Sequence, residues 1–192
     1  MISKKYIAAV IPARGSSKRL KDKNIYPVWG KPMLYWAIAA CKKSKYIDDI
    51  FVSSESEKIL KVAKKYNAQL IKRPKKLAKD KVLKQDVICH AVSWIKSSKK
   101  YKKPDIVISL QPNSPETKTK DLDKAMEKLV RYNRQEIFSV DKNLNQNAAF
   151  RIMTYKTVFQ KSLSTSCGVF VTDYVDIHTL EDLKKVEARK KR

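Results

Sequence analysis

Glycine and cysteine are both scarce in this chain, with three of each among 192 residues. Cys41, Cys89 and Cys167 are an odd number and lack the spacing of metal ligands or of a disulfide framework. They indicate reduced thiols, so we expect a cytoplasmic protein. A chain that uses glycine so rarely keeps it where no other residue fits, which draws attention to Gly15 and Gly30.

Long apolar runs are also missing. The first run, residues 6–11, stops at Pro12, which is too early for a secretory signal, and no later run reaches membrane-spanning length. We therefore expect no membrane partner. The two common glycine-rich phosphate-binding fingerprints, G-x-x-x-x-G-K-[ST] and G-x-G-x-x-G, are absent as well, which excludes the P-loop and dinucleotide-binding classes.

Basic residues are abundant, at 43 Lys and Arg against 19 Asp and Glu, for a formal net charge of +24. Such a charge favours polyanionic partners. However, lysine far outnumbers arginine and is spread along the whole chain, a pattern typical of compositional bias. Aromatic residues are not interleaved with the basic clusters, and no helix-turn-helix or zinc pattern is present, so nucleic-acid binding is the weaker hypothesis. The positive field still favours a phosphorylated substrate.

Short apolar runs alternate with helical patterns through about residue 140. The runs predict strands at 6–11, 50–53, 68–71, 105–110, 137–140 and 168–171. The helical patterns predict one helix that begins near Pro32 and three more at 57–66, 87–95 and 122–129. Two capping boxes mark helix starts: Ser54-x-x-Glu57 leads into the helix at 57–66, and Thr179-x-x-Asp182 predicts a last helix near the C-terminus. Residues 143–166 show no clear period. We predict an α/β fold with αβα layers around a mostly parallel sheet, in a single domain spanning 1–192.

A polar loop follows the first predicted strand and is called here the basic loop, residues 13–24. Gly15, Ser16 and Ser17 can offer backbone N–H groups to a phosphate chain. Its basic side chains can neutralise the phosphate charge; they are Arg14, Lys18, Arg19, Lys21 and Lys23. Because ligands of open α/β sheets bind at the carboxyl ends of strands, the loop is a candidate phosphate site. An ordinary basic surface loop is the alternative.

Two further segments carry candidate site residues. Gln111, Asn113 and Ser114 lie in a loop made rigid by Pro112 and Pro115, directly after the most apolar strand. This loop would point polar side chains toward the same edge of the sheet; a plain turn is the alternative.

Near the C-terminus, Asp176 and His178 are two residues apart, so they point to one side of an extended segment. A carboxylate and an imidazole placed in this way could hold a divalent metal. The alternative is a solvated loop before a helix whose N-cap is Thr179.

Together these segments resemble the acylneuraminate cytidylyltransferases, the CMP-sialic acid synthetases. Six motifs occur in the family's order: residues 11–24 against I-P-A-R-G-G-S-K-x-[IL]-x-x-K-N, 30–32 against G-K-P, 52–57 against V-S-T-D-x-E, 73–80 against R-P-x-x-L-A-x-D, 110–115 against L-Q-P-[TN]-S-P, and 176–179 against D-I-D-T. The resemblance covers most of the chain through residue 115 and then the C-terminal end.

The resemblance implies a Rossmann-like nucleotidyltransferase fold that transfers CMP from CTP to an acidic sugar. It assigns catalysis to Arg14, Lys23 and Asp176, with Mg²⁺ (or Mn²⁺) held by Asp176 and His178. The residues that it implies for nucleotide binding are Ala13, Gly15, Ser16, Lys18, Asn24, Arg73 and Asp80. Those that it implies for sugar binding are Gln111, Asn113 and Ser114.

The sequence departs from the family in three places. His178 stands where the family has a second metal-binding Asp, and Lys81–Lys84 replaces small hydroxyl residues. The segment between Gly168 and Asp176 is short, which implies a reduced or missing dimerisation arm, although a homodimer stays open. The rival hypotheses are a non-catalytic nucleotide-binding or partner subunit, and a nucleotidyltransferase that uses another sugar.

Overall fold

The strands of the chain form one large mixed sheet and one small hairpin. The computed structural model describes residues 2–162 and 164–189. The large sheet has the order β5-β4-β1-β6-β8-β7-β9. Its strands are β1 (Ile7–Pro12), β4 (Asp49–Ser54), β5 (Gln69–Lys72), β6 (Ile106–Leu110), β7 (Glu136–Val140), β8 (Gln146–Thr154) and β9 (Cys167–Val171). The hairpin pairs β2 (Pro27–Val28) with β3 (Lys31–Pro32).

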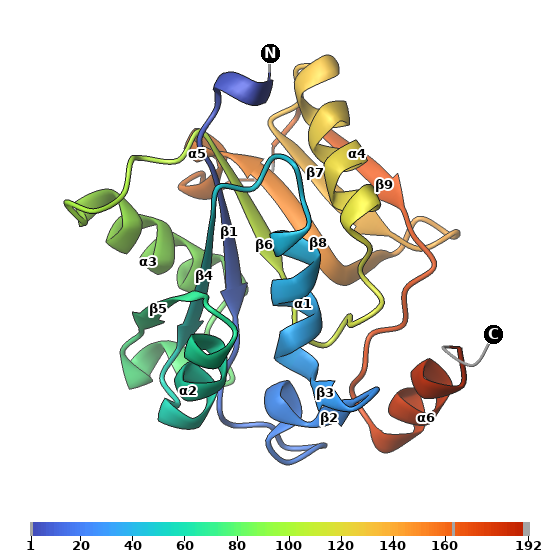
Figure 1. Ribbon diagram of the computed structural model, residues 1–192. Helices are drawn as coiled ribbons and strands as arrows, with labels where there is room; N and C mark the ends of the chain where they lie inside the picture. Colours follow the sequence, from blue (N-terminus) through green and yellow to red (C-terminus); the bar gives the residue numbers. More distant parts are fainter. Residues whose placement is uncertain (1, 163, 190–192) are drawn as a thin grey trace.

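Helices cover both faces of the large sheet, which gives the predicted αβα layers (Figure 1). One face carries α1 (Met33–Lys42), α2 (Glu57–Lys65) and α4 (Thr119–Arg131), and the other carries α3 (Lys84–Ser97) and α5 (Tyr155–Val158). The remaining helices are α6 (Leu180–Arg189) and the short 3₁₀ turns η1 (Ile2–Lys4), η2 (Lys23–Ile25) and η3 (Lys75–Ala78). Within the described ranges, no helix has both the length and the apolar character needed to cross a membrane.

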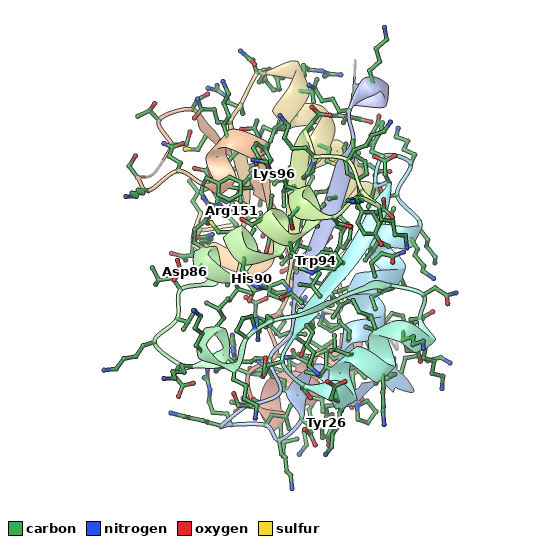
Figure 2. All side chains as sticks on the ribbon, turned by 90° about the vertical axis from the view of Figure 1, so that its left-hand side faces the viewer. Tyr26, Asp86, His90, Trp94, Lys96 and Arg151 are labelled. Carbon is green, nitrogen blue, oxygen red and sulfur yellow. The ribbon has the colours of Figure 1, made fainter. Side chains whose placement is uncertain are left out.

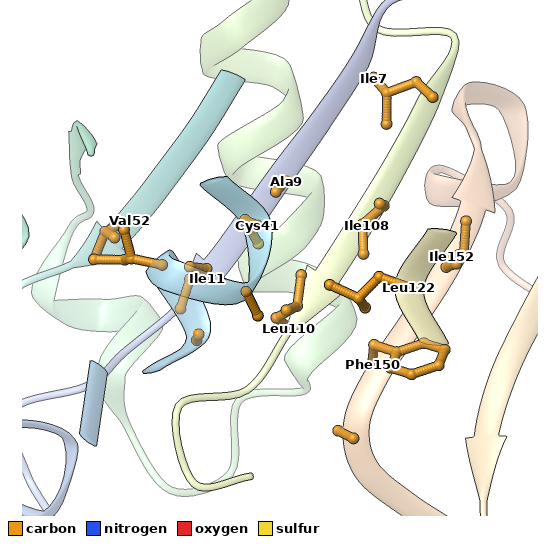
Figure 3. Close-up of a cluster of buried hydrophobic side chains, with 14 of the residues drawn as sticks. Ile7, Ala9, Ile11, Cys41, Val52, Ile108, Leu110, Leu122, Phe150 and Ile152 are labelled. Carbon is orange, nitrogen blue, oxygen red and sulfur yellow. The ribbon is translucent and has the colours of Figure 1, made fainter. Parts of the chain in front are cut away.

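The alternation of side chains along the central strands builds a core on each face. Ile7, Ala9 and Ile11 of β1 point into the larger core, beside Ile108 of β6 and Ile152 of β8 (Figure 3). Ala8 and Val10 point to the opposite core, against α3. Because both faces are covered, β1 is apolar along its whole length, as expected for a buried parallel strand.

Four parallel strands end at the same edge of the sheet. β1 pairs in parallel with β4 and β6, and β4 pairs in parallel with β5. The first residue after each of these strands is polar or leads into a polar loop: Ala13, Glu55, Arg73 and Gln111. This edge therefore gathers the predicted motifs from four distant parts of the chain, as the strand-end rule for open α/β sheets requires.

The C-terminal segment returns to the same edge. Leu183 and Val186 of α6 are buried against Val28 of the hairpin and Met33 of α1. Figure 1 shows α6 beside the β2–β3 hairpin and outside the two helical layers of the large sheet. The backbone N–H of Ile177 donates to the carbonyl of Asn113 at 2.8 Å. These contacts bring the predicted metal-binding segment next to the loop that follows β6.

Two local expectations were wrong. Residues 143–166, expected to lack a regular element, include the nine-residue strand β8, which runs antiparallel to both β6 and β7. The proposed capping box Ser54-x-x-Glu57 is also incorrect, because α2 begins at Glu57 itself. The Ser54 hydroxyl accepts from the N–H of Ser56 instead.

The second predicted capping box is confirmed. The Thr179 Oγ1 accepts from the N–H of Asp182 at 3.2 Å, and the Asp182 carboxylate accepts from the N–H of Thr179 at 2.9 Å. The same carboxylate accepts from the N–H of His178 at 2.9 Å. This reciprocal arrangement begins α6 and fixes the backbone on which His178 sits.

Candidate functional site

A cleft of about 410 Å³ opens at the carboxyl ends of β1, β5 and β6, and it is called here the main cleft. The basic loop, the turn around η3, the start of α3 and the loop after β6 form its walls. Its lining includes Arg14, Ser16, Ser17, Lys18, Arg19, Lys23, Asn24, Arg73, Lys79, Lys84, Gln111, Asn113 and His178. Positive charge thus converges on this cleft from separate elements.

A buried ion pair supports the floor of the cleft. The Glu55 carboxylate accepts from Arg73 Nε at 3.0 Å and Nη2 at 2.8 Å. Its other oxygen accepts from the N–H of Gly15 at 2.7 Å. Burial raises the pKa of Glu55, but the Gly15 N–H and the Arg73 guanidinium outweigh that effect and leave the pKa below its ordinary value. Glu55 therefore stays ionised and ties the basic loop to the ends of β4 and β5.

Glycine is required where the basic loop passes over α2. A Cβ added to Gly15 would lie 2.8 Å from the Cβ of Ser56, closer than packed carbon atoms approach. At the other end of the loop region, Gly30 has φ +75° and follows Trp29 with φ +50° in the two-residue turn of the hairpin. Positive φ at both positions is the geometry that favours glycine. The prediction that rare glycines mark constrained positions is confirmed at both.

Asp80 follows the turn around η3 and contacts two cations of the basic loop directly, and it is not among the lining residues of the main cleft. Its carboxylate lies 2.8 Å from Arg14 Nη1 and 2.7 Å from Lys18 Nζ. Hydrogen bonds from Lys18 and Arg14 lower the pKa of Asp80. All three side chains remain largely exposed, so the contacts can exchange with those to an anionic ligand.

Lys23 joins the basic loop to the C-terminal segment. Its ammonium donates to the carbonyl of Ile177 at 3.2 Å. Burial lowers the pKa of Lys23, and the nearby Arg19 and Arg14 lower it further, while Asp176 and Asp182 oppose the shift. A desolvated ammonium held by a backbone carbonyl is well placed to meet negative charge that enters the cleft.

The predicted metal ligands differ in their surroundings. Asp176 accepts a hydrogen bond from the hydroxyl of Ser114. His178 Nδ1 lies 3.5 Å from Arg19 Nη2. Burial lowers the pKa of His178, and the adjacent Lys23 and Arg19 add to this effect, so the imidazole is neutral at pH 7. Across the described ranges, no three His, Cys, Asp or Glu side chains gather as a metal-binding set.

The donor set therefore fits a particular mode of magnesium binding. Mg²⁺ commonly uses one or two carboxylates, keeps several waters, and takes its remaining ligands from substrate phosphates. Asp176 can supply one such carboxylate, because it lies in the C-terminal segment that Lys23 of the basic loop contacts. His178 is a softer ligand and sits next to a guanidinium, so it adds little to a site for Mg²⁺.

The remaining predicted residues are brought to the same region with different exposures. Gln111 and Asn113 line the main cleft, whereas Ser114 is fully buried beneath Asp176. Asn24 donates to the carbonyl of Arg14 at 2.8 Å and so shapes the basic loop. Ala13, the residue after β1, is fully buried and is not among the described residues that line the main cleft.

Sequence reasoning did not single out three side chains that shape this region: Glu55, Lys84 and Arg151. Glu55 had a signal, because it follows a strand end in the same way as Gln111. Lys84 appeared as a departure from the family pattern and had no assigned role. Arg151 lies on β8, which periodicity did not reveal, and its position beside α3 is visible in Figure 2.

The fold and the site define an α/β protein with a basic cleft at the ends of its parallel strands. The chain belongs to the cytidylyltransferase family, whose model matches residues 8–186. Two curated relatives illustrate the match. The N-acylneuraminate cytidylyltransferase A of Danio rerio is 30% identical over 73% of this chain and 31% of its own length. The pseudaminic acid cytidylyltransferase of Campylobacter jejuni is 32% identical over 68% of this chain and 56% of its own.

Solved structures agree in fold over almost the entire chain. A CMP:2-keto-3-deoxy-manno-octonic acid synthetase complexed with CTP has a TM-score of 0.76 at 14% identity, covering 97% of this chain and 98% of that chain. The 4-diphosphocytidyl-2C-methyl-D-erythritol synthase of Anaerococcus prevotii has a TM-score of 0.69 at 14% identity, covering 98% and 99%. These likenesses establish the nucleotidyltransferase fold. The chain spans about a quarter to a half of the length of the curated relatives it matches.

Proposed function

We propose that this chain transfers CMP from CTP to a 2-keto sugar acid of the sialic-acid type and releases pyrophosphate. The observation that carries the proposal is the convergence of Arg14, Lys18, Arg19 and Lys23 on the strand ends of a cytidylyltransferase fold. A triphosphate is the kind of ligand that such a cluster neutralises.

In the proposed reaction a sugar hydroxyl attacks the α-phosphorus of CTP, and pyrophosphate leaves. Charge builds on the phosphate oxygens, so the protein acts mainly by positioning and by fixed positive charge. Lys23 and Arg14 supply that charge, while the Glu55–Arg73 pair holds the loop in place. The proposed nucleotide contacts also include Asn24, whose amide would lie near the ribose.

The proposed cofactor is Mg²⁺, bound to the nucleotide phosphates and to the carboxylate of Asp176. When bound, Mg²⁺ would offset the negative charge of the nucleotide phosphates. We also propose that Gln111 and Asn113 bind the sugar acid. The proposed location of the protein is the cytoplasm. Asp80, which holds Arg14 and Lys18, would exchange these contacts for the triphosphate when CTP enters.

One observation favours a second candidate, a nucleotide-binding relative without turnover. His178 replaces a carboxylate in the family pattern, and its neighbours Lys23 and Arg19 oppose a further positive charge there. The test is pyrophosphate release from CTP, UTP, ATP and GTP with a panel of sugar acids in Mg²⁺ and Mn²⁺. Release that requires both CTP and an acid supports the enzyme. Stabilisation by CTP without release under any condition supports the second candidate.

A further inference from the structure

The chain between β9 and α6 carries the predicted metal ligand Asp176, and its residues 173–177 are called here the strap (Figure 1). No helix, strand or turn of the described chain includes the strap. The loop after β6 holds it instead. The N–H of Ile177 donates to the carbonyl of Asn113 at 2.8 Å, and the hydroxyl of Ser114 donates to the Asp176 carboxylate. The position of the strap therefore depends on contacts with another segment.

Glu116 extends these contacts to the residue next to Asp176. Its Oε2 accepts from the N–H of Val175 at 2.9 Å. The Glu116 side chain is only 14% exposed, so this contact is largely shielded from solvent. A charged acceptor in such a place forms a stronger hydrogen bond than a neutral one. Because Val175 directly precedes Asp176, the bond limits the positions that the Asp176 carboxylate can take.

Arg189, the last residue of α6, holds Glu116 in place. Its Nη1 lies 3.2 Å from Glu116 Oε2 and 3.4 Å from Oε1, and it donates to the carbonyl of Asp173 at 2.7 Å. The buried side chains of Leu183 and Val186 fix the helix that carries it. One guanidinium thus joins the loop after β6 to the first residue of the strap. Glu116, Asp173 and Arg189 are called here the clasp.

Stability accounts for little of the clasp. The Arg189 side chain is 40% exposed, and an ion pair with an exposed partner contributes little to the free energy of unfolding. The location of the clasp is more informative. It holds the strap immediately before Asp176, while the other end of the strap meets the basic loop, where the Lys23 ammonium donates to the carbonyl of Ile177 at 3.2 Å. Neither Glu116 nor Arg189 lies within the six family motifs.

We infer that Glu116 is a positioning residue and that Arg189 orients it, an inference that rests on the proposed function. Through the N–H of Val175, Glu116 fixes the strap so that the Asp176 carboxylate and the Ile177 carbonyl stay beside the basic loop. Neither Glu116 nor Arg189 is among the described residues that line the main cleft. The pair therefore acts through the strap and not on the nucleotide.

The test compares three variants. Glu116→Ala removes the acceptor, Glu116→Gln keeps an oxygen that can accept from Val175, and Arg189→Met removes the guanidinium. The matched control is Glu187→Ala, because Glu187 is exposed on α6 and makes no hydrogen bond or ion pair with a described residue. The readouts are amide hydrogen exchange at 173–177 in the protein alone, Mn²⁺ binding to the CTP-loaded protein by EPR, and kcat and KM for CTP with Mg²⁺.

Glu116→Ala should speed amide exchange in the strap about 10- to 100-fold, the loss expected for one hydrogen bond to a charged group. kcat should fall about 10- to 100-fold and Mn²⁺ binding should weaken, since a reacting geometry displaced by about 1 Å carries a cost of this order. KM for CTP should change less than about twofold, because Glu55 holds the basic loop independently of the strap. Arg189→Met should show smaller changes in the same direction. Glu116→Gln should recover most of the loss, and Glu187→Ala should match the parent.

Faster exchange in Glu116→Ala with parental kcat and Mn²⁺ binding overturns the inference, because the clasp is then only structural. Unchanged exchange in the strap, or equal losses in Glu187→Ala, also overturns it. If Glu116→Ala does not fold, Arg189→Met decides by the same readouts. If the parent releases no pyrophosphate with any sugar acid, the proposed function fails, and amide exchange with Mn²⁺ binding still decides the role of Glu116.

Discussion

Removal of the Lys23 ammonium should separate catalysis from folding. In Lys23→Ala the cleft loses a desolvated cation that donates to Ile177 at 3.2 Å. Loss of one donor aimed at developing charge costs about 10²- to 10³-fold in kcat, or about 2.7–4 kcal/mol in the activation barrier. We therefore expect kcat to fall by that factor at saturating CTP and sugar acid.

The same substitution should leave stability nearly unchanged. The hydrogen bond to Ile177 is lost, but so are the burial of the ammonium and its repulsion by Arg19 and Arg14. These effects oppose one another, so the free energy of unfolding should shift by less than about 1 kcal/mol. Denaturant melts and steady-state kinetics measure the two quantities. Lys21→Ala, an exposed lysine of the same loop, is the matched control and should retain full activity.

The pH profile adds an independent check. Because burial and neighbouring cations lower the pKa of Lys23, its charge is lost at a lower pH than that of an ordinary lysine. kcat/KM for CTP should therefore decline as pH rises through this lowered value. Lys23→Arg keeps its charge and should move the decline to higher pH. The reasoning about Lys23 is refuted if Lys23→Ala retains activity within a factor of a few, or if Lys23→Arg leaves the profile unmoved.

Three further changes test the loop, its support and the metal site. Gly15→Ala should destabilise the protein by about 1–3 kcal/mol and weaken CTP binding, because the added Cβ would lie 2.8 Å from the Cβ of Ser56. Adding Ser56→Gly to this variant should restore stability in denaturant melts and affinity in CTP titrations. If neither recovers, this clash is not the cause. Glu55→Gln should raise KM for CTP by loosening Arg73 and the loop, with unchanged KM counting against this role. His178→Asp should tighten apparent Mg²⁺ affinity and reduce any advantage of Mn²⁺ in metal titrations of pyrophosphate release; equal affinity in parent and variant would show that position 178 lies outside the metal's reach.

Much of the fold could be predicted because its signals are local. The strands ending at Pro12 and Leu110 are short apolar runs bounded by proline, and the reciprocal cap at Thr179 involves residues three apart. β8 could not be predicted in this way. It is covered on both faces, so its apolar residues do not alternate, and it includes Arg151, whose charge is satisfied by Glu136 on β7. Only the pairing of β8 with β7 makes that arginine compatible with a central strand.

The residues of the candidate site also differ in whether a local signal predicts them. Residues that follow strand ends within a motif, such as Arg14 and Gln111, could be placed from the sequence, because parallel strands end at one edge. The contact between α3 and β8 could not, since Gln85 and Arg151 lie 66 positions apart and meet only through the packing of α3 against the sheet. The role of Glu55 depends in the same way on contacts with Gly15 and Arg73, which come from other loops.

The central claim, that CMP moves from CTP to a sugar acid, is tested most directly by ³¹P NMR of a complete reaction. The sample holds the parent protein, CTP, Mg²⁺ and one 2-keto sugar acid, with Lys23→Ala as the matched control. The account predicts that a phosphodiester signal and pyrophosphate appear in equal amounts in the parent sample, and far more slowly in the control. It is contradicted if CTP binds yet stays intact with every sugar acid tried, or if pyrophosphate forms with free CMP and no phosphodiester.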